Sequence, residues 1–238
     1  EIVSDATRHM MSGGMVVRPV ISSACPAVLR LIQVRFPELI PHVLPLCAPI
    51  EVAARMAKRE AAARTGRPAA EIGVVFISPC PAKVTAVKRP MGSKVSAVDA
   101  VVAVRDVYPK LIRLMKQVKA PEELASSGRM GLGWGSSGGE AAALLNDRYL
   151  AADGIENVIK VLEDLEDDKF TDLDFVELNA CSAGCVGGVL NVENPYVAKA
   201  KLKRIRKYLP VSCNHIGDEV PREVKYDQMV EYQPVMEL

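Results

Sequence analysis

The chain has 238 residues, of which 49% are hydrophobic and 25% charged, as is ordinary for a globular protein with one large domain or two lobes. Its net charge of +1 gives no electrostatic reason to expect nucleic acid or an anionic membrane as a partner. No apolar run approaches the roughly 20 residues that cross a bilayer, and six cysteines are too few for a disulfide scaffold. We therefore expect a cytoplasmic protein, and a fragment of a longer one because the chain begins at Glu1.

The first half of the chain alternates apolar runs with helical patterns. Residues 15–21, 72–77 and 98–104 are rich in β-branched side chains, which is typical of buried parallel strands. Pro26 stands where a helical turn would begin after the first run, and Gly66 predicts the end of an alanine-rich helix. Apolar residues at helical spacing over 107–118 predict a further helix.

The second half begins after a loop that we expect over residues 121–139, which contains a glycine-rich stretch at 131–139. Its predicted elements are helices over 140–152 and 155–165, a strand over 173–178 and a basic helix over 197–208. This rhythm predicts an α/β fold with parallel sheets flanked by helices. The expected organisation is a lobe over 15–125, a second lobe over 126–212 and a tail over 213–238.

Three of the predicted strands are each followed by a cysteine segment. Residues 22–26 read SSACP, residues 78–83 read SPCPAK and residues 179–185 read NACSAGC. Because ligands in open α/β sheets lie beyond the carboxyl ends of strands, we expect these four cysteines to meet at one metal site.

Four thiolates suit an iron–sulfur cluster, zinc or copper(I). A structural zinc site normally takes a local cysteine pair from each side, whereas only Cys181 and Cys185 form a local pair here. The alternative is that each cysteine is simply a small buried apolar residue.

The three segments resemble the three signature motifs of the iron-iron (FeFe) hydrogenase catalytic domain. Those motifs read roughly TSCCP, MPCxxKxxE and ACxxGCxxGGG, and their counterparts occur here in the same order. The glycine-rich stretch with Trp134 is similar to the family's FGATGG segment, which lies between the second and third motifs. The resemblance runs from about Met15 to Tyr196, and three motifs together are far more specific than any one.

The resemblance implies a cofactor, the H-cluster, in the cleft between two lobes. It consists of a 4Fe–4S cubane joined through one cysteine to a two-iron unit with carbonyl, cyanide and bridging dithiolate ligands. By position, Cys25, Cys80, Cys181 and Cys185 would hold the cubane, and Cys185 would also bridge to the two-iron unit. Lys83 matches the lysine that hydrogen-bonds a cyanide, and its charge suits a buried anion.

Several positions depart from the family's proton path. In the family a cysteine delivers the proton to the distal iron, and the corresponding residue here is Ala24. The family's glutamate after the lysine is Ala86, and its relay serine aligns with Leu44. Where relay carboxylates usually lie, this chain offers only Ser4 and Thr7. A path without titratable groups implies slow turnover.

Residues expected around the two-iron unit also differ from the family pattern. The methionines before the second and third motifs are Ser78 and Asn179, and the glutamine that follows a proline is Ile50, after Pro49. Trp134 is a further residue that we expect beside the cofactor. These departures resemble the sensory branch of the family, which is thought to report hydrogen rather than metabolise it.

The function implied by the resemblance is slow, reversible interconversion of H2 and protons, used for hydrogen or redox sensing in an anaerobic setting. Since the chain has no CxxCxxC run, electrons would come from a ferredoxin-like donor or an upstream iron–sulfur domain, with a signalling module as a further partner. Two alternatives stay open at this point. One is a non-enzymatic Nar-type iron–sulfur assembly factor, and the other is a redox-switch domain, each holding only a cubane.

Residues 133–138 formally fit the GxGxxG pattern of dinucleotide-binding loops. That fingerprint should follow a strand, whereas residues 122–129 read as a polar loop. We therefore expect this stretch to pack close to the cluster rather than to bind a phosphate.

Overall fold

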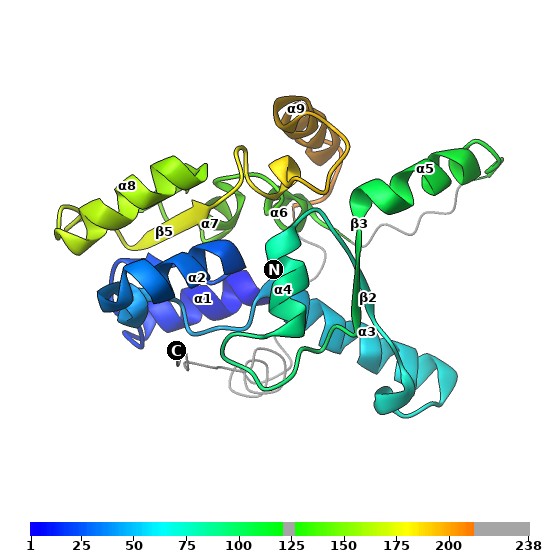
Figure 1. Ribbon diagram of the computed structural model, residues 1–238, viewed down its shortest axis with the longest axis horizontal. Coiled ribbons are helices and arrows are strands. Elements are labelled where there is room, and N and C mark those ends of the chain that lie inside the picture. Colours follow the sequence, from blue (N-terminus) through cyan, green and yellow to red (C-terminus); the bar gives the residue numbers. More distant parts are fainter. Residues whose placement is uncertain (121–126, 212–238) are drawn as a thin grey trace.

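The computed structural model describes residues 1–120 and 127–211, so the expected tail over 213–238 and part of the expected loop over 121–139 lie outside the described residues. Two parallel sheets combine with flanking helices, which confirms the predicted α/β class (Figure 1). Within the described part of the chain, no helix is long and apolar enough to cross a membrane.

The larger sheet joins segments that are far apart in the sequence. In spatial order its strands are β1 (Val20–Ile21), β5 (Phe175–Asn179) and β4 (Tyr149–Asp153), all paired in parallel. The central strand β5 is buried from its first residue to Leu178. Burial on both faces explains why Phe175, Val176 and Leu178 are apolar, and it makes the buried Glu177 an exception.

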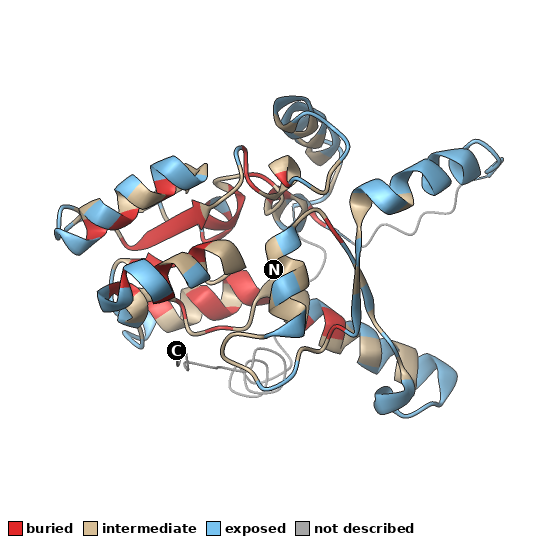
Figure 2. Ribbon diagram, in the orientation of Figure 1, coloured by how far each residue is buried: buried red, intermediate tan, exposed pale blue. Residues whose placement is uncertain are grey.

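Helices cover both faces of this sheet. They are α1 (Ile2–Ser12), α2 (Pro26–Arg35), α3 (Pro49–Thr65), α7 (Gly139–Ala143) and α8 (Ile155–Glu166). Because side chains alternate along a strand, Phe175 faces one core and Val176 faces the other. The first core takes residues from α1, α3 and α7, and the second takes residues from α2 and α8. Figure 2 shows that buried residues concentrate around this sheet.

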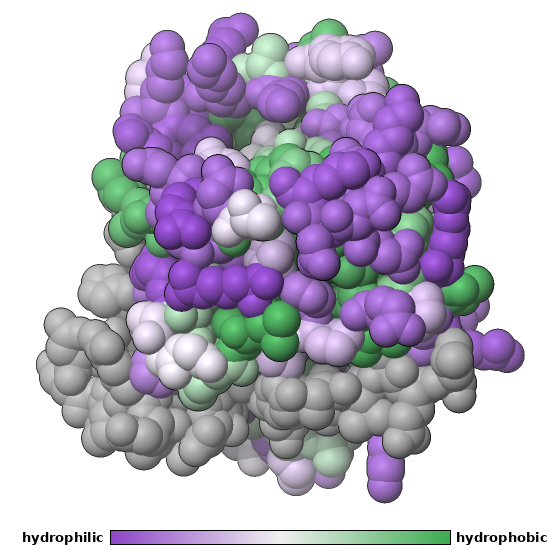
Figure 3. Space-filling view, turned by 90° about the vertical axis from the view of Figure 1, so that its left-hand side faces the viewer, coloured by the Kyte–Doolittle hydropathy of each residue, from purple (hydrophilic) through white to green (hydrophobic). Residues whose placement is uncertain are grey.

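The outer helix α8 shows how the sequence directs this packing. Its buried residues Val158, Leu162 and Leu165 recur at spacings of four and three, so they form one stripe that faces the sheet. The side of the molecule at the left of Figure 1, where α8 ends, is mostly hydrophilic with scattered hydrophobic patches (Figure 3). Val158, Leu162 and Leu165 thus lie inside the fold, whereas Ile155 at the start of α8 is exposed.

The smaller sheet consists of β2 (Val75–Ser78) and β3 (Ala100–Ala103), paired in parallel over all four residues. The helix α4 (Pro81–Lys88) follows β2, and α5 (Val104–Met115) continues directly from β3. Few side chains of the described residues cover this smaller sheet and its helix α5. Ile77 in β2 is 50% exposed, none of the twelve residues of α5 is buried, and α5 extends away from the rest of the molecule in Figure 1.

Short helices and one basic helix complete the described chain. They are η1 (Pro37–His42), η2 (Ala69–Glu71), α6 (Arg129–Gly133), η3 (Cys185–Gly187) and the basic helix α9 (Pro195–Arg206). The helix α3 ends as the sequence predicts, because Gly66 adopts a left-handed conformation with φ of 70°.

Two element predictions are wrong in extent. The strand expected over 15–21 forms only at Val20–Ile21, because Pro19 has no N–H to donate to a ladder. The helix expected over 140–152 ends at Ala143, and β4 follows. Leu145 there has φ of 55° and the Oδ1 atom of Asn146 accepts the Arg148 N–H (2.7 Å), which turns the chain into the strand.

The sheets do not follow the expected lobe boundary near residue 125. β1 belongs to the expected first lobe but pairs with β5 of the second, so the larger sheet draws on both halves of the chain. The expected loop over 121–139 also contains helical turns, those of α6. The helix α1 precedes the first strand, where we had predicted no element.

Candidate metal centre

Cys25 and Cys80 occupy equivalent places in the two sheets. Cys25 is the N-cap residue of α2 shortly after β1, and Cys80 is the N-cap residue of α4 shortly after β2. Each has an extended backbone and is followed by a proline, Pro26 or Pro81, at the start of the helix. Proline suits this position because the N–H that it lacks would be unpaired there. The sequence Cys-Pro thus holds each thiol near the carboxyl end of a strand.

The third segment is a tight loop after β5 that carries Cys181 and Cys185. Ala183 and Gly184 between them have φ values of 67° and 86°, so the chain reverses direction between the two thiols. The N–H of Ala183 donates a hydrogen bond of 2.9 Å to the Oδ1 atom of Asp153. Asp153 is the last residue of β4, so the loop is fixed to the end of the neighbouring strand.

The glycine-rich stretch packs against this third segment. Ser137 donates its N–H to the carbonyl of Ala183 (3.1 Å), and Val186 donates its N–H to the carbonyl of Gly135 (2.9 Å). A Cβ atom on Gly184 would lie only 2.4 Å from the Ser137 nitrogen. The glycines therefore permit a close backbone approach between this stretch and the loop of Cys181 and Cys185.

The third segment also contacts the second, which lies on the other sheet. Leu190 donates its N–H to the carbonyl of Pro79 (3.1 Å), and a Cβ atom on Gly188 would lie 2.3 Å from the same oxygen. Pro79 directly precedes Cys80. This contact therefore brings the loop of Cys185 beside the segment of Cys80.

The four thiols lie within electrostatic range of one another. Burial raises the pKa of Cys181 to about 11, and the charges of Cys80, Cys25 and Cys185 add to this effect. Burial also raises the pKa of Cys185, while the positive charge of Lys83 lowers it. Protein without metal therefore keeps these two thiols protonated at neutral pH, and a bound cation is needed to hold them as thiolates.

The arrangement suits a cluster better than a single ion. Over residues 1–120 and 127–211, no three His, Cys, Asp or Glu side chains lie close enough together to share one metal ion. A 4Fe–4S cubane instead offers four separate iron atoms, each of which takes one thiolate. Four half-buried cysteines that surround a common region are a donor set of that kind.

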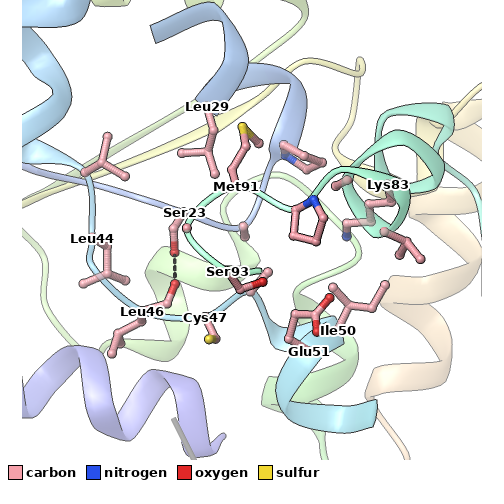
Figure 4. Close-up of a pocket in the computed structure, with 18 residues that line it drawn as sticks. Ser23, Leu29, Leu44, Leu46, Cys47, Ile50, Glu51, Lys83, Met91 and Ser93 are labelled. Atoms are coloured by element: carbon pink, nitrogen blue, oxygen red, sulfur yellow. Dashed lines mark hydrogen bonds between the residues drawn. The ribbon is translucent and has the colours of Figure 1, made fainter. Parts of the chain in front are cut away.

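A cavity of about 110 Å³ adjoins Lys83, on the first turns of α4 (Figure 4). Its lining includes Ala24 and Ile50, which the sequence places beside the cofactor. It also includes Leu44 and Ala86, two positions of the family's proton path. These four lining residues are all aliphatic, so the positions that carry relay groups in the family form an apolar wall here.

Other expected cofactor residues lie outside the lining of this cavity. Ser78 is buried at the end of β2, where its Oγ atom accepts a backbone N–H two residues on (3.1 Å). Asn179 donates from Nδ2 to the carboxylate of Glu177 (2.9 Å). Pro49 begins α3. Cys185 does not line the cavity either, although Lys83 acts on its pKa.

Two buried polar atoms, Ser4 Oγ and Trp134 Nε1, have no hydrogen-bond partner among the described residues. Trp134 packs against the first core. Thr7, on α1 like Ser4, is buried and donates from Oγ1 to the carbonyl of Val3 (2.8 Å). The structure thus places Ser4 and Thr7 inside the protein, and neither carries a carboxylate.

Two buried carboxyl groups were missed in the sequence. Glu140 on α7 is 5% exposed and Glu177 on β5 is 2% exposed. The signal for Glu177 was a charged residue inside an otherwise apolar strand run, which is a costly position unless the charge has partners. No local pattern marked Glu140, because its burial depends on the packing of α7 against the larger sheet.

The family profile of the iron only hydrogenase large subunit, C-terminal domain, matches residues 4–149 and 140–189. These matches cover well over half of the chain. The chain belongs to the iron-only hydrogenase family. All three cysteine segments lie inside the matched ranges, and so do Lys83 and the glycine-rich stretch.

Solved structures of iron-only hydrogenases have a similar fold. One, described as showing stepwise H-cluster assembly in HydA(deltaEFG), has a TM-score of 0.63 and 18% identity, with 98% of this chain and 79% of that chain covered. Another is apo HydA1 from Chlamydomonas reinhardtii, variant C377H, with a TM-score of 0.64, 16% identity, and 97% and 80% coverage. No protein of curated function gives a significant match. At these identities the likeness establishes the fold.

Proposed function

We propose that the chain binds an H-cluster and interconverts hydrogen and protons slowly, as a sensor of hydrogen or of redox state. The observation that carries this proposal is the meeting of four thiols from three segments beside Lys83, in a chain of the iron-only hydrogenase family. The proposal explains why a half-buried lysine and four half-buried cysteines share one region without forming, among the described residues, a site for a single ion.

The residues present fit the two parts of the cofactor. Cys25, Cys80, Cys181 and Cys185 would hold the cubane, and Cys185 would also join it to the two-iron unit. When bound, that unit would supply the metal chemistry that splits or forms hydrogen. Lys83 would hold and neutralise an anionic ligand, since an ammonium group donates strong charge-assisted hydrogen bonds.

Slow turnover follows from the cavity wall. Ala24, Leu44 and Ala86 cannot bind or release a proton, so these three positions supply no relay group here. A positioned acid typically contributes about 10²–10⁴-fold to a rate, and the chain forgoes that contribution here. Slow turnover suits a protein that reports hydrogen to a signalling partner and takes electrons from a ferredoxin-like donor.

The test is anaerobic reconstitution in two steps. Iron and sulfide should first yield the absorbance of a 4Fe–4S cubane in the wild type and in Cys47→Ser, a thiol outside the three segments, but not in Cys80→Ser. Addition of a synthetic two-iron complex should then give infrared bands of bound carbonyl and cyanide. A cubane that never acquires those bands would indicate a redox-switch or assembly protein, and failure to form a cubane would overturn the proposal.

A further inference from the structure

The buried carboxyl groups of Glu140 and Glu177 form a pair inside the larger sheet's packing. Glu177 accepts three hydrogen bonds of 2.9 Å, from the N–H groups of Gly138 and Ala141 and from Nδ2 of Asn179. The side chain of Glu140 accepts a hydrogen bond of 2.6 Å from the hydroxyl of Ser22. Several donors favour the charged form of a carboxylate, so the negative charge of the pair belongs on Glu177.

Glu140 therefore holds the proton of the pair. Burial, followed by the negative charge of Glu177, raises the pKa of Glu140 from 4.5 to about 8, while the bond from Ser22 and the charge of Lys83 lower it. Burial also raises the pKa of Glu177, but its hydrogen bonds oppose this. Two buried carboxylates cannot both stay ionised at close range. The result is an acid that is neutral at pH 7 and can still titrate.

The pair borders the cysteine segments on more than one side. The hydroxyl of Ser22 also accepts the N–H of Ala24 (3.1 Å), in the first segment. The charge of Lys83 acts on Glu140, and the charge of Glu177 raises the pKa of Cys185. The pair is not part of the apolar cavity wall.

The charged groups around Glu140 come from β5, α4 and α1. β5 contributes Glu177, α4 contributes Lys83, and β1 is followed by the neutral Ser22. From α1, Arg8 reaches the end of α7, where it donates to the carbonyl of Ala143 (2.7 Å) and pairs with Asp5.

We propose that Glu140 is a redox-linked proton site of the cysteine-bound cluster, with Glu177 and Ser22 as its positioning residues. This inference rests on the proposed function. Above about pH 8, where Glu140 is ionised, its carboxylate would bind one proton from the solvent when a bound cluster gains one electron from a ferredoxin-type donor. When the electron leaves, that proton returns to water. An added negative charge nearby strengthens proton binding by a buried carboxyl, and protonation in turn favours reduction.

The first test uses protein without metal. Between about pH 4.5 and 8 the folded wild type keeps the Glu140 proton while the unfolded chain releases it, so stability falls as pH rises through this range. The loss approaches tenfold in the folding equilibrium constant per pH unit. Glu140→Gln keeps a hydrogen-bond acceptor but cannot titrate, so urea denaturation should show a smaller slope, with the remainder coming from Glu177, whose pKa is also raised. Glu163→Gln, an exposed partner of Arg35, should keep the wild-type slope. Equal slopes in wild type and Glu140→Gln would overturn the inference.

The second test uses the reconstituted cubane without the two-iron unit. Its midpoint potential, measured between about pH 6 and 10, should be constant while Glu140 is protonated and should then fall by up to about 59 mV per pH unit, which is tenfold in the reduction equilibrium. Glu140→Gln should give a flat profile. Ser22→Ala removes a bond that lowers the pKa of Glu140, so the onset should move to higher pH.

The outcomes separate the two proposals. A cubane whose potential has the same pH profile in wild type and Glu140→Gln overturns this inference and leaves the proposed function standing. Failure of wild type to take up a cubane overturns both, even if the stability slope shows that Glu140 titrates. If Glu140→Gln does not fold, the shifted onset in Ser22→Ala decides.

Discussion

At the scale of single residues, Lys83 is the group with the most demanding position. It comes three residues after Cys80, lines an otherwise mostly aliphatic cavity, and lowers the pKa values of both Cys181 and Cys185. Glu51 lines the same cavity, and a bound anion would give the ammonium group of Lys83 a direct partner for its charge. The placement of Lys83 therefore suits an anionic ligand.

Replacing Lys83 with methionine separates the two parts of the cofactor. Methionine keeps the length and apolar volume of the side chain but removes the ammonium group. We expect Lys83→Met to form the cubane normally and to retain the two-iron unit poorly, measured as iron content and infrared band intensity after gel filtration. Lys88→Met, at the end of the same helix, is the control. Full retention by Lys83→Met would contradict the assigned role.

A second prediction at this scale concerns Ala24, where the family has its proton-delivering cysteine. Cysteine at this position would place one titratable group on the cavity wall, while Leu44 and Ala86 would remain aliphatic. A complete relay acid is typically worth about 10²–10⁴-fold, so Ala24→Cys should recover only part of that range. Hydrogen evolution by matured wild type and variant, with one reductant, measures it. High activity in the wild type would contradict slow turnover.

At the scale of elements, the loop between Cys181 and Cys185 depends on one glycine. Gly184 has φ of 86° and ψ of −157°, a region that is essentially reserved for glycine, and a Cβ atom would collide with Ser137. Strain and overpacking together predict that Gly184→Ala costs about 2–4 kcal/mol. Urea denaturation measures this. Gly73→Ala, with open space around its Cβ position, should be close to neutral, and similar losses in both would refute the argument.

The two sheets should also differ in local stability. β5 is buried almost throughout, whereas β2 has exposed side chains and none of the residues of α5 is buried. Regions with few buried contacts open at lower free energy. Hydrogen exchange should therefore label β2, β3 and α5 well before β5, and uniform protection would show that the smaller sheet is held by contacts outside the described residues.

The sequence predicts an element well where local backbone preferences determine its boundaries, and poorly where tertiary packing determines them. Pro26 and Gly66 set local backbone conformations, so the boundaries that they predict are confirmed. The helix predicted over 140–152 is wrong beyond Ala143, because the turn at Leu145 and the pairing of β4 with β5 override the helical composition of this stretch. Local patterns also could not reveal that Glu140 meets Glu177, since the meeting depends on tertiary packing.

In the candidate site, too, some features could be predicted from local sequence and others depend on the fold. The cysteines follow strands as predicted, because the positions of short apolar runs are local information. Their roles as ligands stay a prediction. The cavity wall of Ala24, Leu44 and Ala86 joins residues from separate segments and becomes visible only in the fold.

At the scale of the whole molecule, the cysteines connect the two sheets. Cys25 and Cys181 follow strands of the larger sheet, while Cys80 follows a strand of the smaller one. Cluster binding should therefore stabilise the weaker sheet as well as the stronger one, because ligand binding energy adds to folding energy. Hydrogen exchange of β2 and β3 should slow on reconstitution in the wild type and stay fast in Cys80→Ser. Unchanged exchange in the wild type would mean that the cluster does not bridge the sheets.

The pairing of β1 with β5 has a consequence for how the protein is made. Val20 finds its partner, Phe175, only after most of the chain has left the ribosome. Until then the strand that precedes Cys25 has no partner in the larger sheet, and contacts so distant in sequence form slowly. A cluster that takes all four thiols would therefore form only after the third cysteine segment has been synthesised and β5 has paired with β1.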